Sequence, residues 1–530
     1  MAFRMSLAAL VAVALAGAAA AEPADKAVAV ASGLLQGQVE DGVASFKAIP
    51  YAAPPVEALR WRAPQPPLRW RGVRPAKAFG PACIQTHGAG GYRGPESEDC
   101  LTLNVWTPAP RHGAGGRGAR LPVMVWLHGG GFIGGTGARY DGTRFASDGV
   151  VLVTINYRLG RLGFFAHPAL ARTNPDGNLA DFGLADQIAA LRWVRANIAA
   201  FGGDPANVTL AGESAGAVSV NNLMISPMAR GLFAKAITES SFARVPATPL
   251  ASALAQGARL AAALGITGDD AKAAAALRSA PARAFTTPIA SLTDQDRPGP
   301  IIDGVVVSQS VPAAFAKGEQ APVPLIVGGN SFEASLFGLV RTHPDAVLGL
   351  LGPARDKAVA MFGGSDAVRA AANIVTLSFV IEPDRFLARR QAALGAPAFV
   401  YYFSYVPQDL RASSLGAGHG AEVSYVFETL PKVAIDREAD DTRLGPARIP
   451  AATAADEKIS AAIHAYWVAF AKTGDPAAAG GPRWPAATEA NDALIEFGDD
   501  GVEVRRDFDR AKLDLFAARA EAAGGLTPAP

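Results

Sequence analysis

The residues best suited to chemistry in this sequence stand in a short glycine-flanked segment, GESAG at residues 212–216. The segment fits G-x-S-x-G, in which a sharp turn between a strand and a helix lifts the serine hydroxyl to the carboxyl edge of a sheet. Residues 208–212 predict such a strand, and a helical pattern follows. Gly, Ala and Ser are abundant in this chain, so the motif gains its weight from that context. We predict that Ser214 is a nucleophile.

A serine hydroxyl is a weak nucleophile at neutral pH, and it needs a base, a group that orients the base and donors for the oxyanion. The segment HGGGF at residues 128–132 follows a predicted strand, and its glycines leave backbone N–H groups unshielded. The HGGG pattern is typical of the oxyanion loop of esterases and lipases. We predict that the N–H groups of Gly130, Gly131 and Ala215 are the donors. A purely structural glycine-rich turn is the alternative.

His419 is the first candidate for the base, because its neighbours are glycine-rich and predicted to be exposed. An ordinary surface histidine is the alternative, and the residue types alone do not single out an acid. The seven histidines are scattered along the chain, so we expect no metal. A serine mechanism of this kind needs no cofactor either.

The elements that must position these residues follow an α/β pattern, because short apolar β-branched runs alternate with helical periodicity. Residues 123–128 and 150–156 are continuous apolar runs, as expected for strands buried on both faces. Further strands are predicted at 324–328 and 398–405. Residues 184–198 carry one apolar stripe and predict an amphipathic helix.

Between residues 249 and 285 the chain becomes alanine-rich and predicts helices. In a sheet enzyme such an insertion commonly forms part of a cap beside the active site, and ordinary helical packing is the alternative. The predicted fold class is therefore α/β, with a mostly parallel central sheet, flanking helices and inserted helical cap segments.

The bulk composition favours a large globular protein without a highly charged partner. Of the 530 residues, 50% are hydrophobic and 18% are charged, which supports a sizeable core. The 49 basic residues balance the 48 acidic ones, so nothing predicts nucleic acid or an anionic membrane surface as partner. No linker-like segment divides the chain. We expect one catalytic domain over residues 22–530.

The N-terminus has the features of an export signal. Arg4 precedes the apolar residues 5–15, and three alanines at 19–21 offer an A-x-A cleavage site before Glu22. The apolar core is shorter than the ~20 residues that a bilayer span needs, although an uncleaved anchor remains the alternative. We predict a signal peptide at 1–21, no integral membrane segment after its removal, and a periplasmic or secreted protein.

The predicted export also bears on the bonding state of Cys83 and Cys100, which are the only cysteines in the chain. An oxidising compartment favours a disulfide between them, and two buried free thiols are the alternative.

Taken together, the ordered motifs resemble the type-B carboxylesterase family, the α/β-hydrolase branch that includes cholinesterases and bacterial p-nitrobenzyl esterases. The resemblance runs from about Gly33 almost to the C-terminus. Besides GESAG, it rests on EDCLTLN at 98–104, NYRLG at 156–160, FGGDP at 201–205 and the aromatic motifs at 466–471. The resemblance implies an α/β-hydrolase fold and hydrolysis of carboxylic esters.

The resemblance also selects the other members of a catalytic triad. The family's acid follows a strand in a G-x-x-x-x-E pattern, which here is GGNSFE and implies Glu333. The family's base lies in G-A-x-H-x-x-E, which here is GAGHGAE and implies His419. The order of serine, acid and histidine is the one that this fold uses.

Three structural pairs are implied in the same way. Cys83 and Cys100 match the family's first disulfide. Arg60 and Arg158 match arginines that pair with carboxylates, which here are Glu98 and Asp186.

Departures from the family bear on the substrate. The loop between the cysteines is short and has Tyr92 as its only aromatic residue, so a choline ester is not expected. The resemblance places Phe132, Leu336 and Phe337 along the substrate gorge, and a mostly apolar pocket suits aryl or short-acyl esters.

Three charged residues also depart from the family's usual pattern. Glu239 replaces the family's usual Gln and could add a charge near the site. Arg161 and Arg244 are expected to be solvated surface charges. If either faced the pocket, an acidic acyl group would become a plausible substrate feature.

The leading prediction is thus an exported serine hydrolase of small-molecule carboxylic esters. The same machinery could instead act on a carbamate, an amide or a lactone. A non-catalytic binding module of the cholinesterase-like fold is a further alternative, because a fold alone does not fix a function. The sequence does not indicate an oligomeric state.

Overall fold

The computed structural model describes residues 24–86, 92–109, 120–177, 179–286, 297–349, 351, 355–436, 448–477, 480–488 and 490–527. The predicted signal peptide at 1–21 lies outside these residues.

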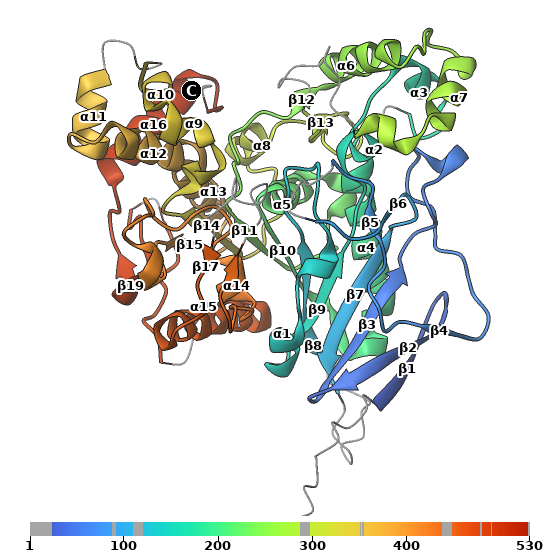
Figure 1. Ribbon diagram of the computed structural model, residues 1–530, viewed down its shortest axis with the longest axis horizontal. Coiled ribbons are helices and arrows are strands. Elements are labelled where there is room, and N and C mark those ends of the chain that lie inside the picture. The colour runs from blue at the N-terminus through green and yellow to red at the C-terminus, as the bar shows by residue number, and fades with distance from the viewer. Residues whose placement is uncertain are drawn as a thin grey trace, which may run out of the picture.

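A 13-stranded mixed sheet forms the centre of the protein (Figure 1). Its strands run in the order β1-β2-β3-β7-β9-β8-β10-β11-β14-β15-β18-β19, and β4 pairs with β2. The pairs from β9 to β18 are parallel, whereas the pairs at both ends are antiparallel. The sheet strands are β1 (Ala24–Val30), β2 (Gly33–Glu40), β3 (Val43–Pro50), β4 (Val73–Pro75), β7 (Thr102–Pro108), β8 (Leu121–Leu127), β9 (Val151–Ile155), β10 (Gly203–Glu213), β11 (Lys235–Glu239), β14 (Leu325–Asn330), β15 (Ala398–Phe403), β18 (Leu494–Gly498) and β19 (Gly501–Arg505).

Strand β8 shows how the sheet is buried on both faces. Val123, Val125 and Leu127 pack into one core with residues of α4 (Phe182–Asn197) and α5 (Ala215–Ile225). Met124 and Trp126 point the other way, into a core with α1 (Thr143–Ser147) and α15 (Ala454–Thr473). Successive side chains of a strand face opposite sides of the sheet, so a continuous apolar run fills both cores. The predicted strand at 123–128 and helix at 184–198 are confirmed, with bounds shifted by one or two residues.

Two further groups of helices lie above the sheet in the view of Figure 1. At the upper right are α2 (Gly160–Gly163), α3 (Pro168–Thr173), α6 (Leu250–Ala263) and α7 (Ala271–Ser279), which include the predicted helices of segment 249–285. At the upper left are α9 (Gly338–Thr342), α10 (Pro344–Gly349), α11 (Arg355–Gly363), α12 (Ala367–Thr376) and α16 (Arg510–Ala522), which share a small apolar core of their own. The remaining helices are α8 (Val311–Lys317), α13 (Glu382–Ala393) and α14 (Val423–Val426).

The remaining strands form three short pairs outside the central sheet. They are β5 (Ala82–Cys83) with β6 (Glu96–Ser97), β12 (Thr248–Pro249) with β13 (Ile301–Ile302), and β16 (Ile435–Asp436) with β17 (Arg448–Ile449).

The disulfide implied by the resemblance is present between Cys83 and Cys100, and it closes a loop with a sequence separation of 17 residues. On the chain-entropy account a loop of this length stabilises the fold by about 3 kcal/mol. Arg60 pairs with Glu98 and Arg158 pairs with Asp186, at 2.6 and 2.7 Å between guanidinium nitrogen and carboxylate oxygen. Both predicted ion pairs are therefore confirmed.

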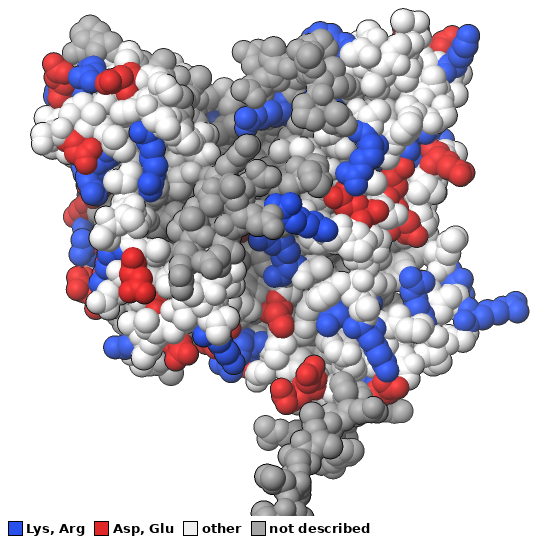
Figure 2. All heavy atoms as spheres, viewed as in Figure 1, with Lys and Arg blue, Asp and Glu red and all other residues white. Residues whose placement is uncertain are grey.

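Lys, Arg, Asp and Glu side chains are interspersed over the described surface in Figure 2, in keeping with the near-neutral balance of the chain. Within the described ranges, no helix is both long and apolar enough to cross a membrane.

Candidate active site

The adjacent strands β8, β10, β11 and β14 are parallel, so their carboxyl ends lie along one edge of the sheet. In open α/β sheets this edge is where ligands bind. The predicted oxyanion loop follows β8, Ser214 follows β10 and Glu333 follows β14. The topology thus gathers segments that are far apart in the sequence, from His128 to Glu333.

Ser214 lies in a sharp turn between β10 and α5, with φ 55° and ψ −123°. A non-glycine residue in this region is strained and persists only where the surroundings enforce it. Here close backbone packing at the two flanking glycines enforces it. A Cβ on Gly212 would lie 2.6 Å from the carbonyl carbon of Gly216, and a Cβ on Gly216 would lie 2.0 Å from the Leu127 oxygen. The motif therefore needs both glycines, because the start of α5 lies directly against the backbone of β8 and β10.

The loop after β8 also depends on glycine. Gly130 has φ 108°, and a Cβ there would lie 2.1 Å from the Gly134 oxygen. Gly131 has φ 60°, the left-handed region. Among the hydrogen bonds of the described residues, none uses the N–H groups of Gly130, Gly131 or Ala215 as donor. The three predicted oxyanion donors are thus unengaged backbone groups beside the serine turn.

His128, at the start of this loop, has a structural environment. Its ring stacks on Tyr157 at 4.3 Å between centroids, and its Nδ1 lies 2.8 Å from the Gly129 oxygen. Burial lowers the pKa of His128 to about 4, so the ring is neutral at physiological pH. Tyr157 donates from its hydroxyl to the His128 carbonyl at 2.7 Å. These contacts fix the end of β8 from which the glycine loop departs.

Glu333 and His419 are in direct contact, with 2.5 Å between Glu333 Oε2 and His419 Nδ1. The other carboxylate oxygen, Oε1, accepts from the Asn330 backbone N–H at 2.7 Å and from the Ser240 hydroxyl at 2.5 Å. The Ser335 hydroxyl accepts from the His419 backbone N–H at 2.8 Å. Glu333 is 1% exposed, so the carboxylate and its donors form a buried, hydrogen-bonded cradle for the imidazole.

The opposite side of the imidazole faces the residue just before the serine. His419 Nε2 lies 3.0 Å from Glu213 Oε1, and it has no hydrogen-bond partner among the described residues. Burial lowers the pKa of His419, but Glu213, Glu333 and Glu422 outweigh this effect and raise the pKa to about 9. Several buried carboxyls so close together cannot all ionise freely. Burial and neighbouring acids accordingly raise the pKa of Glu213, and that of Glu422 to about 8.

Glu239 is a fifth ionisable group near the site, and it lies at the end of β11. Its Oε1 accepts from the Trp467 indole N–H at 2.7 Å, and its fully buried Oε2 has no partner in the described residues. Burial, and then the charges of Glu422 and Glu213, raise its pKa well above the ordinary value for glutamate. The carboxyl considered from the sequence as an extra charge is therefore turned toward α15, in surroundings that disfavour its ionised form.

The two arginines considered from the sequence have different surroundings. The prediction of a solvated Arg244 is wrong, because its guanidinium is buried and forms a bidentate pair with Glu382 at 2.7 and 2.8 Å. The partner carboxylate comes from α13, over 130 residues away, so no local pattern indicated it. Arg161 is half-buried and lines a pocket beside α6.

Of the predicted gorge residues, Phe132 lies closest in sequence to the glycines that are predicted to form the oxyanion hole. It is 7% exposed and packs edge-to-face on Phe164 at 4.8 Å between ring centroids. Leu336 is half-buried and Phe337 is 40% exposed, both just after Glu333. In the described part of the chain, no group of three or more His, Cys, Asp or Glu side chains is arranged to hold a metal ion.

Comparison with known proteins agrees with this geometry. Residues 24–347 and 363–516 match the model of the carboxylesterase family. The chain belongs to the carboxylesterase family. It is 36% identical over 494 residues to a fumonisin B1 esterase from Sphingopyxis macrogoltabida, which covers 88% of this chain and 85% of that protein. It is 33% identical over 515 residues to a para-nitrobenzyl esterase from Bacillus subtilis, which covers 92% and 98%.

Solved structures of the family are also similar. A p-nitrobenzyl esterase aligns with a TM-score of 0.75 at 30% identity, over 92% of this chain and 99% of that one. A carboxylesterase from Geobacillus stearothermophilus aligns with a TM-score of 0.77 at 33% identity and the same coverage. The α/β-hydrolase fold and the family resemblance are therefore confirmed, and this carboxylesterase is a carboxylic ester hydrolase.

Sequence reasoning missed several residues that support the site. Glu213 was visible inside the serine motif, but nothing in the pattern indicated that its carboxylate faces His419. Ser240 and Asn330 donate to Glu333 from the ends of β11 and β14. Their position at the carboxyl ends of these strands was the one available signal, because polar residues at the carboxyl ends of parallel strands converge.

A first prediction concerns the pH dependence of ester hydrolysis. The Glu213 charge raises the pKa of His419, and a base must be neutral to accept a proton. In Glu213→Gln, the acid limb of kcat/KM is therefore expected to move to lower pH than in the wild-type carboxylesterase. The measurement is a kcat/KM profile between about pH 5 and pH 10 with a neutral ester.

The matched control is Glu503→Gln, which removes an exposed carboxylate on β19 at the edge of the sheet. Its acid limb should coincide with the wild-type limb. An acid limb that stays in place in Glu213→Gln would contradict the electrostatic role of Glu213.

A second prediction concerns Glu239. Because its folded-state pKa is raised, the folded chain retains a proton that the unfolded chain releases near the ordinary glutamate pKa. Between the ordinary glutamate pKa and the raised pKa of the folded state, the free energy of unfolding of the wild type therefore falls by about 1.4 kcal/mol per pH unit as pH rises. Glu239→Gln cannot ionise at this position. The unfolding temperature of this variant minus that of the wild type should therefore be larger at pH 8 than at pH 5.

The comparison variant is Glu239→Ala, which leaves a cavity and an unpaired Trp467 indole N–H. It should lose roughly 2–4 kcal/mol at both pH values. Calorimetry at the two pH values tests both expectations. A Glu239→Gln difference that does not depend on pH would mean that the carboxyl is not held protonated.

Proposed function

We propose that this carboxylesterase cleaves its esters through an acyl-enzyme on Ser214, with His419 as general base and Glu333 as the group that orients it. The observation that carries the proposal is the 2.5 Å contact between Glu333 Oε2 and His419 Nδ1. This contact leaves Nε2 as the ring nitrogen that can accept a proton, and it stabilises the imidazolium that results. The strained turn at Ser214 and the unengaged amides of the glycine loop supply further support.

In the first half of the reaction, Ser214 Oγ bonds to the ester carbonyl carbon while its proton passes to His419 Nε2. The carbonyl oxygen becomes an oxyanion that the N–H groups of Gly130, Gly131 and Ala215 stabilise. Each such donor contributes about 3–4 kcal/mol to the transition state. The intermediate then collapses, the bond to the alcohol oxygen breaks, and His419 gives its proton to the leaving alcohol.

In the second half, water takes the place of the alcohol. His419 removes a proton from the water as its oxygen bonds to the acyl carbon. Collapse of the second intermediate releases the carboxylic acid and returns the proton to Ser214 Oγ. Glu333 stays ionised throughout, because its role is to hold the tautomer and to balance the imidazolium.

Export is part of the proposal. The disulfide between Cys83 and Cys100 supports it, because such bonds persist in oxidising compartments and are rare in the cytosol. The signal at residues 1–21 would deliver the carboxylesterase to the periplasm or beyond, where small esters are its substrates.

The proposed mechanism is tested with p-nitrophenyl esters from acetate to octanoate, using exported wild-type protein and Ser214→Ala. Wild type should show a burst of p-nitrophenol followed by steady turnover, because the acyl-enzyme accumulates. Ser214→Ala should lose roughly three or more orders of magnitude in kcat. The exported protein is expected to begin at Glu22.

A wild-type unfolding temperature of Ser214→Ala would show that the variant is folded, so that its loss of activity is a loss of catalysis. Full activity in this variant would exclude Ser214 as the nucleophile. Absence of turnover by folded wild type with every ester would contradict general ester hydrolysis and would direct attention to carbamates, amides or lactones.

A further inference from the structure

Residues 66–74 form a loop in a strongly basic stretch of the chain, and we call them the basic loop. Residues 58–95 contain seven Lys and Arg residues and no Asp or Glu, whereas the whole chain has a net charge of +1. The even balance of the chain therefore conceals one segment with a charge of a single sign. Within the basic loop, Arg69, Arg71 and Arg74 are exposed.

The basic loop also exposes apolar side chains. Leu68 is 73% exposed and Val73 is 50% exposed, and they are two of the ten large apolar side chains that are exposed among the described residues. A third, Phe79, follows shortly after the loop. Exposed apolar groups that gather in one place commonly mark an interaction surface.

Trp70 holds the basic loop against the start of β2. Its indole N–H donates to the Leu34 carbonyl at 2.9 Å, and its backbone N–H donates to the Ser32 carbonyl at 3.0 Å. A Cβ on Gly33 would lie 2.5 Å from the indole nitrogen, so the ring lies directly on the backbone of β2. The exposed groups are therefore carried on a preformed support, which lowers the entropic cost of binding there.

Two guanidinium groups of the basic loop are uncompensated. Among the described residues, the side chains of Arg69 and Arg71 have no hydrogen bond, ion pair or ring contact. Lys77, just after the loop, differs from them because it pairs with Asp25. Both arginines are thus available to an anionic partner.

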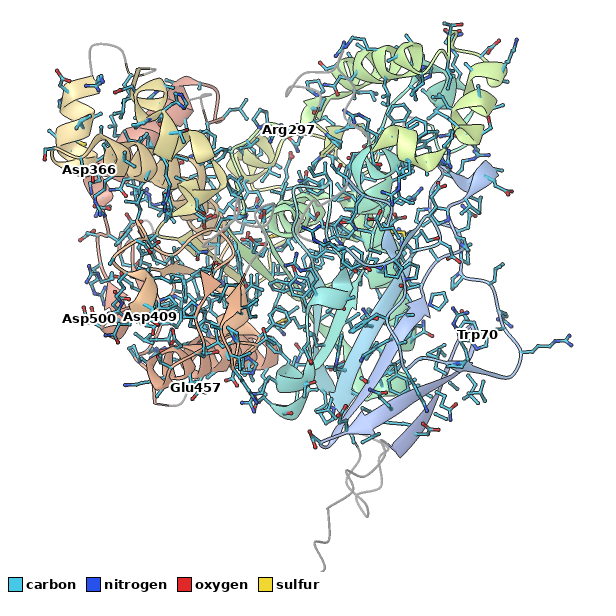
Figure 3. The ribbon with its side chains drawn as sticks, viewed as in Figure 1. Trp70, Arg297, Asp366, Asp409, Glu457 and Asp500 are labelled. Atoms are coloured by element: carbon cyan, nitrogen blue, oxygen red, sulfur yellow. A yellow bond between two sulfur atoms is a disulfide. The ribbon has the colours of Figure 1, made fainter. Side chains whose placement is uncertain are left out.

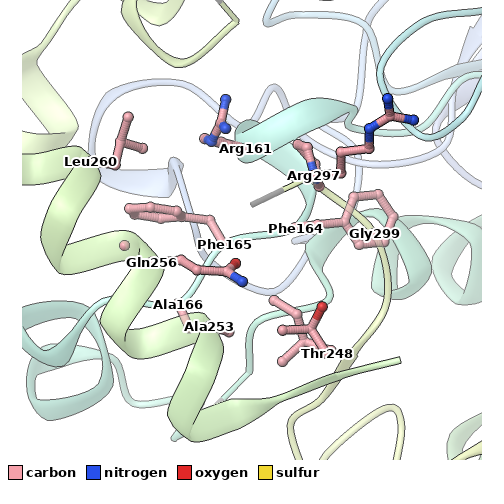
Figure 4. A pocket seen from close by; sticks show the side chains of 13 residues that line it. Arg161, Phe164, Phe165, Ala166, Thr248, Ala253, Gln256, Leu260, Arg297 and Gly299 are labelled. Atoms are coloured by element: carbon pink, nitrogen blue, oxygen red, sulfur yellow. The ribbon is translucent and has the colours of Figure 1, made fainter. Parts of the chain in front are cut away.

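The basic loop lies near one end of the sheet, away from the candidate active site. Strands β3, β7 and β9 separate β2 from β8, after which the glycine loop begins. Figure 3 places Trp70 near the right-hand edge of the molecule, and a basic side chain projects from the outline on that side in Figure 2. Of the described residues that line the pocket beside α6 (Figure 4), none belongs to the basic loop. Substitutions in the loop should therefore leave ester hydrolysis unchanged.

The chemistry of the loop favours a lipid surface over simpler roles. Charges and Pro beside an edge strand such as β4 can prevent sheets from pairing edge to edge, but that role does not require exposed Leu68 and Val73. A dissolved polyanion would likewise leave the apolar side chains in water. An anionic bilayer accommodates both features, because its headgroups attract guanidinium groups and its interface receives apolar side chains.

We propose that the basic loop binds an anionic phospholipid surface and so holds the carboxylesterase at a membrane by peripheral contact. Arg69 and Arg71 contact the lipid phosphate groups, and Leu68 enters the boundary between headgroups and acyl chains. This contact is independent of the chemistry at Ser214.

Cosedimentation with vesicles tests the proposal. Wild type is expected to bind vesicles of phosphatidylglycerol and phosphatidylethanolamine at about 20 mM NaCl and to be released as NaCl rises to about 500 mM, because salt screens the charges. It should stay in solution with vesicles of phosphatidylcholine alone. The variants are Arg69→Gln/Arg71→Gln and Leu68→Ser, and all proteins begin at the same residue, so a difference between them arises from the loop.

The double arginine variant should bind the anionic vesicles about 25-fold more weakly, because each basic residue near such a surface contributes about fivefold to the affinity. Leu68→Ser should bind about threefold more weakly, because it removes an apolar contact with the interface. The matched control is Arg505→Gln/Arg506→Gln, which removes two exposed charges at the end of β19 and should bind as wild type does. The substituted side chains are exposed, so every variant should keep the wild-type unfolding temperature and hydrolysis of p-nitrophenyl acetate.

Wild type that stays in solution with the anionic vesicles at low salt would overturn the proposal. Equal binding by wild type and both loop variants would also overturn it, because the contact would then lie elsewhere on the chain. Retention on immobilised heparin that is lost in the double arginine variant, without binding to vesicles, would assign the loop to a dissolved polyanion and exclude the lipid surface.

Discussion

The left-handed backbone of Ser214 is the constraint on which the rest of the site depends. Such a conformation costs a non-glycine residue about 1–3 kcal/mol and persists only where packing enforces it. Here β10 and α5 meet so closely that Gly212 and Gly216 leave no space for a side chain. The Ser214 N–H also donates to the Glu239 carbonyl at 2.8 Å, which ties the turn to β11. Because β8, β10 and β11 are neighbours, the same contacts that strain the serine also set its position relative to the glycine loop after β8.

Around this fixed point the carboxylesterase holds acidic groups in two different environments. Glu333 accepts three hydrogen bonds, one of them from His419, so both of its carboxylate oxygens have partners. Glu239 receives one hydrogen bond on one oxygen and is buried without a partner for the other in the described residues, which favours the neutral acid. Two glutamates, one at the end of β11 and one just after β14, therefore have very different hydrogen-bond environments.

Much of the fold could be predicted from the sequence, because its central strands are continuous apolar runs. Strand β10 begins earlier than predicted, at Gly203, because that residue pairs with Leu121 across an irregularity that hydrophobicity does not reveal. The strands at the two edges of the sheet were not predicted. Strand β2, for example, buries only Leu35 and Gly37 among its eight residues, so its signal is weak.

The residues of the candidate site also differ in how far the sequence could predict them. Local motifs alone led to the prediction of Ser214 and the glycine loop, whereas the prediction of Glu333 required the family resemblance. The pairing of Arg244 with Glu382 and the raised pKa of Glu239 depend on contacts between distant segments, and only the folded chain reveals them. The spacing of residues in the sequence thus predicts candidate chemical groups, but it does not predict how burial and distant neighbours shift their pKa values.

The measurement that tests the account most directly is covalent labelling with diethyl p-nitrophenyl phosphate, followed by mass spectrometry of the intact chain and of its peptides. The phosphorus centre mimics the tetrahedral intermediate, and it bonds only to a serine that has a working base and oxyanion donors. The account predicts one diethylphosphoryl group per wild-type chain, on Ser214, with labelling slowed strongly in His419→Ala. A folded wild-type chain that remains unlabelled, or that carries the label on another residue, would contradict it.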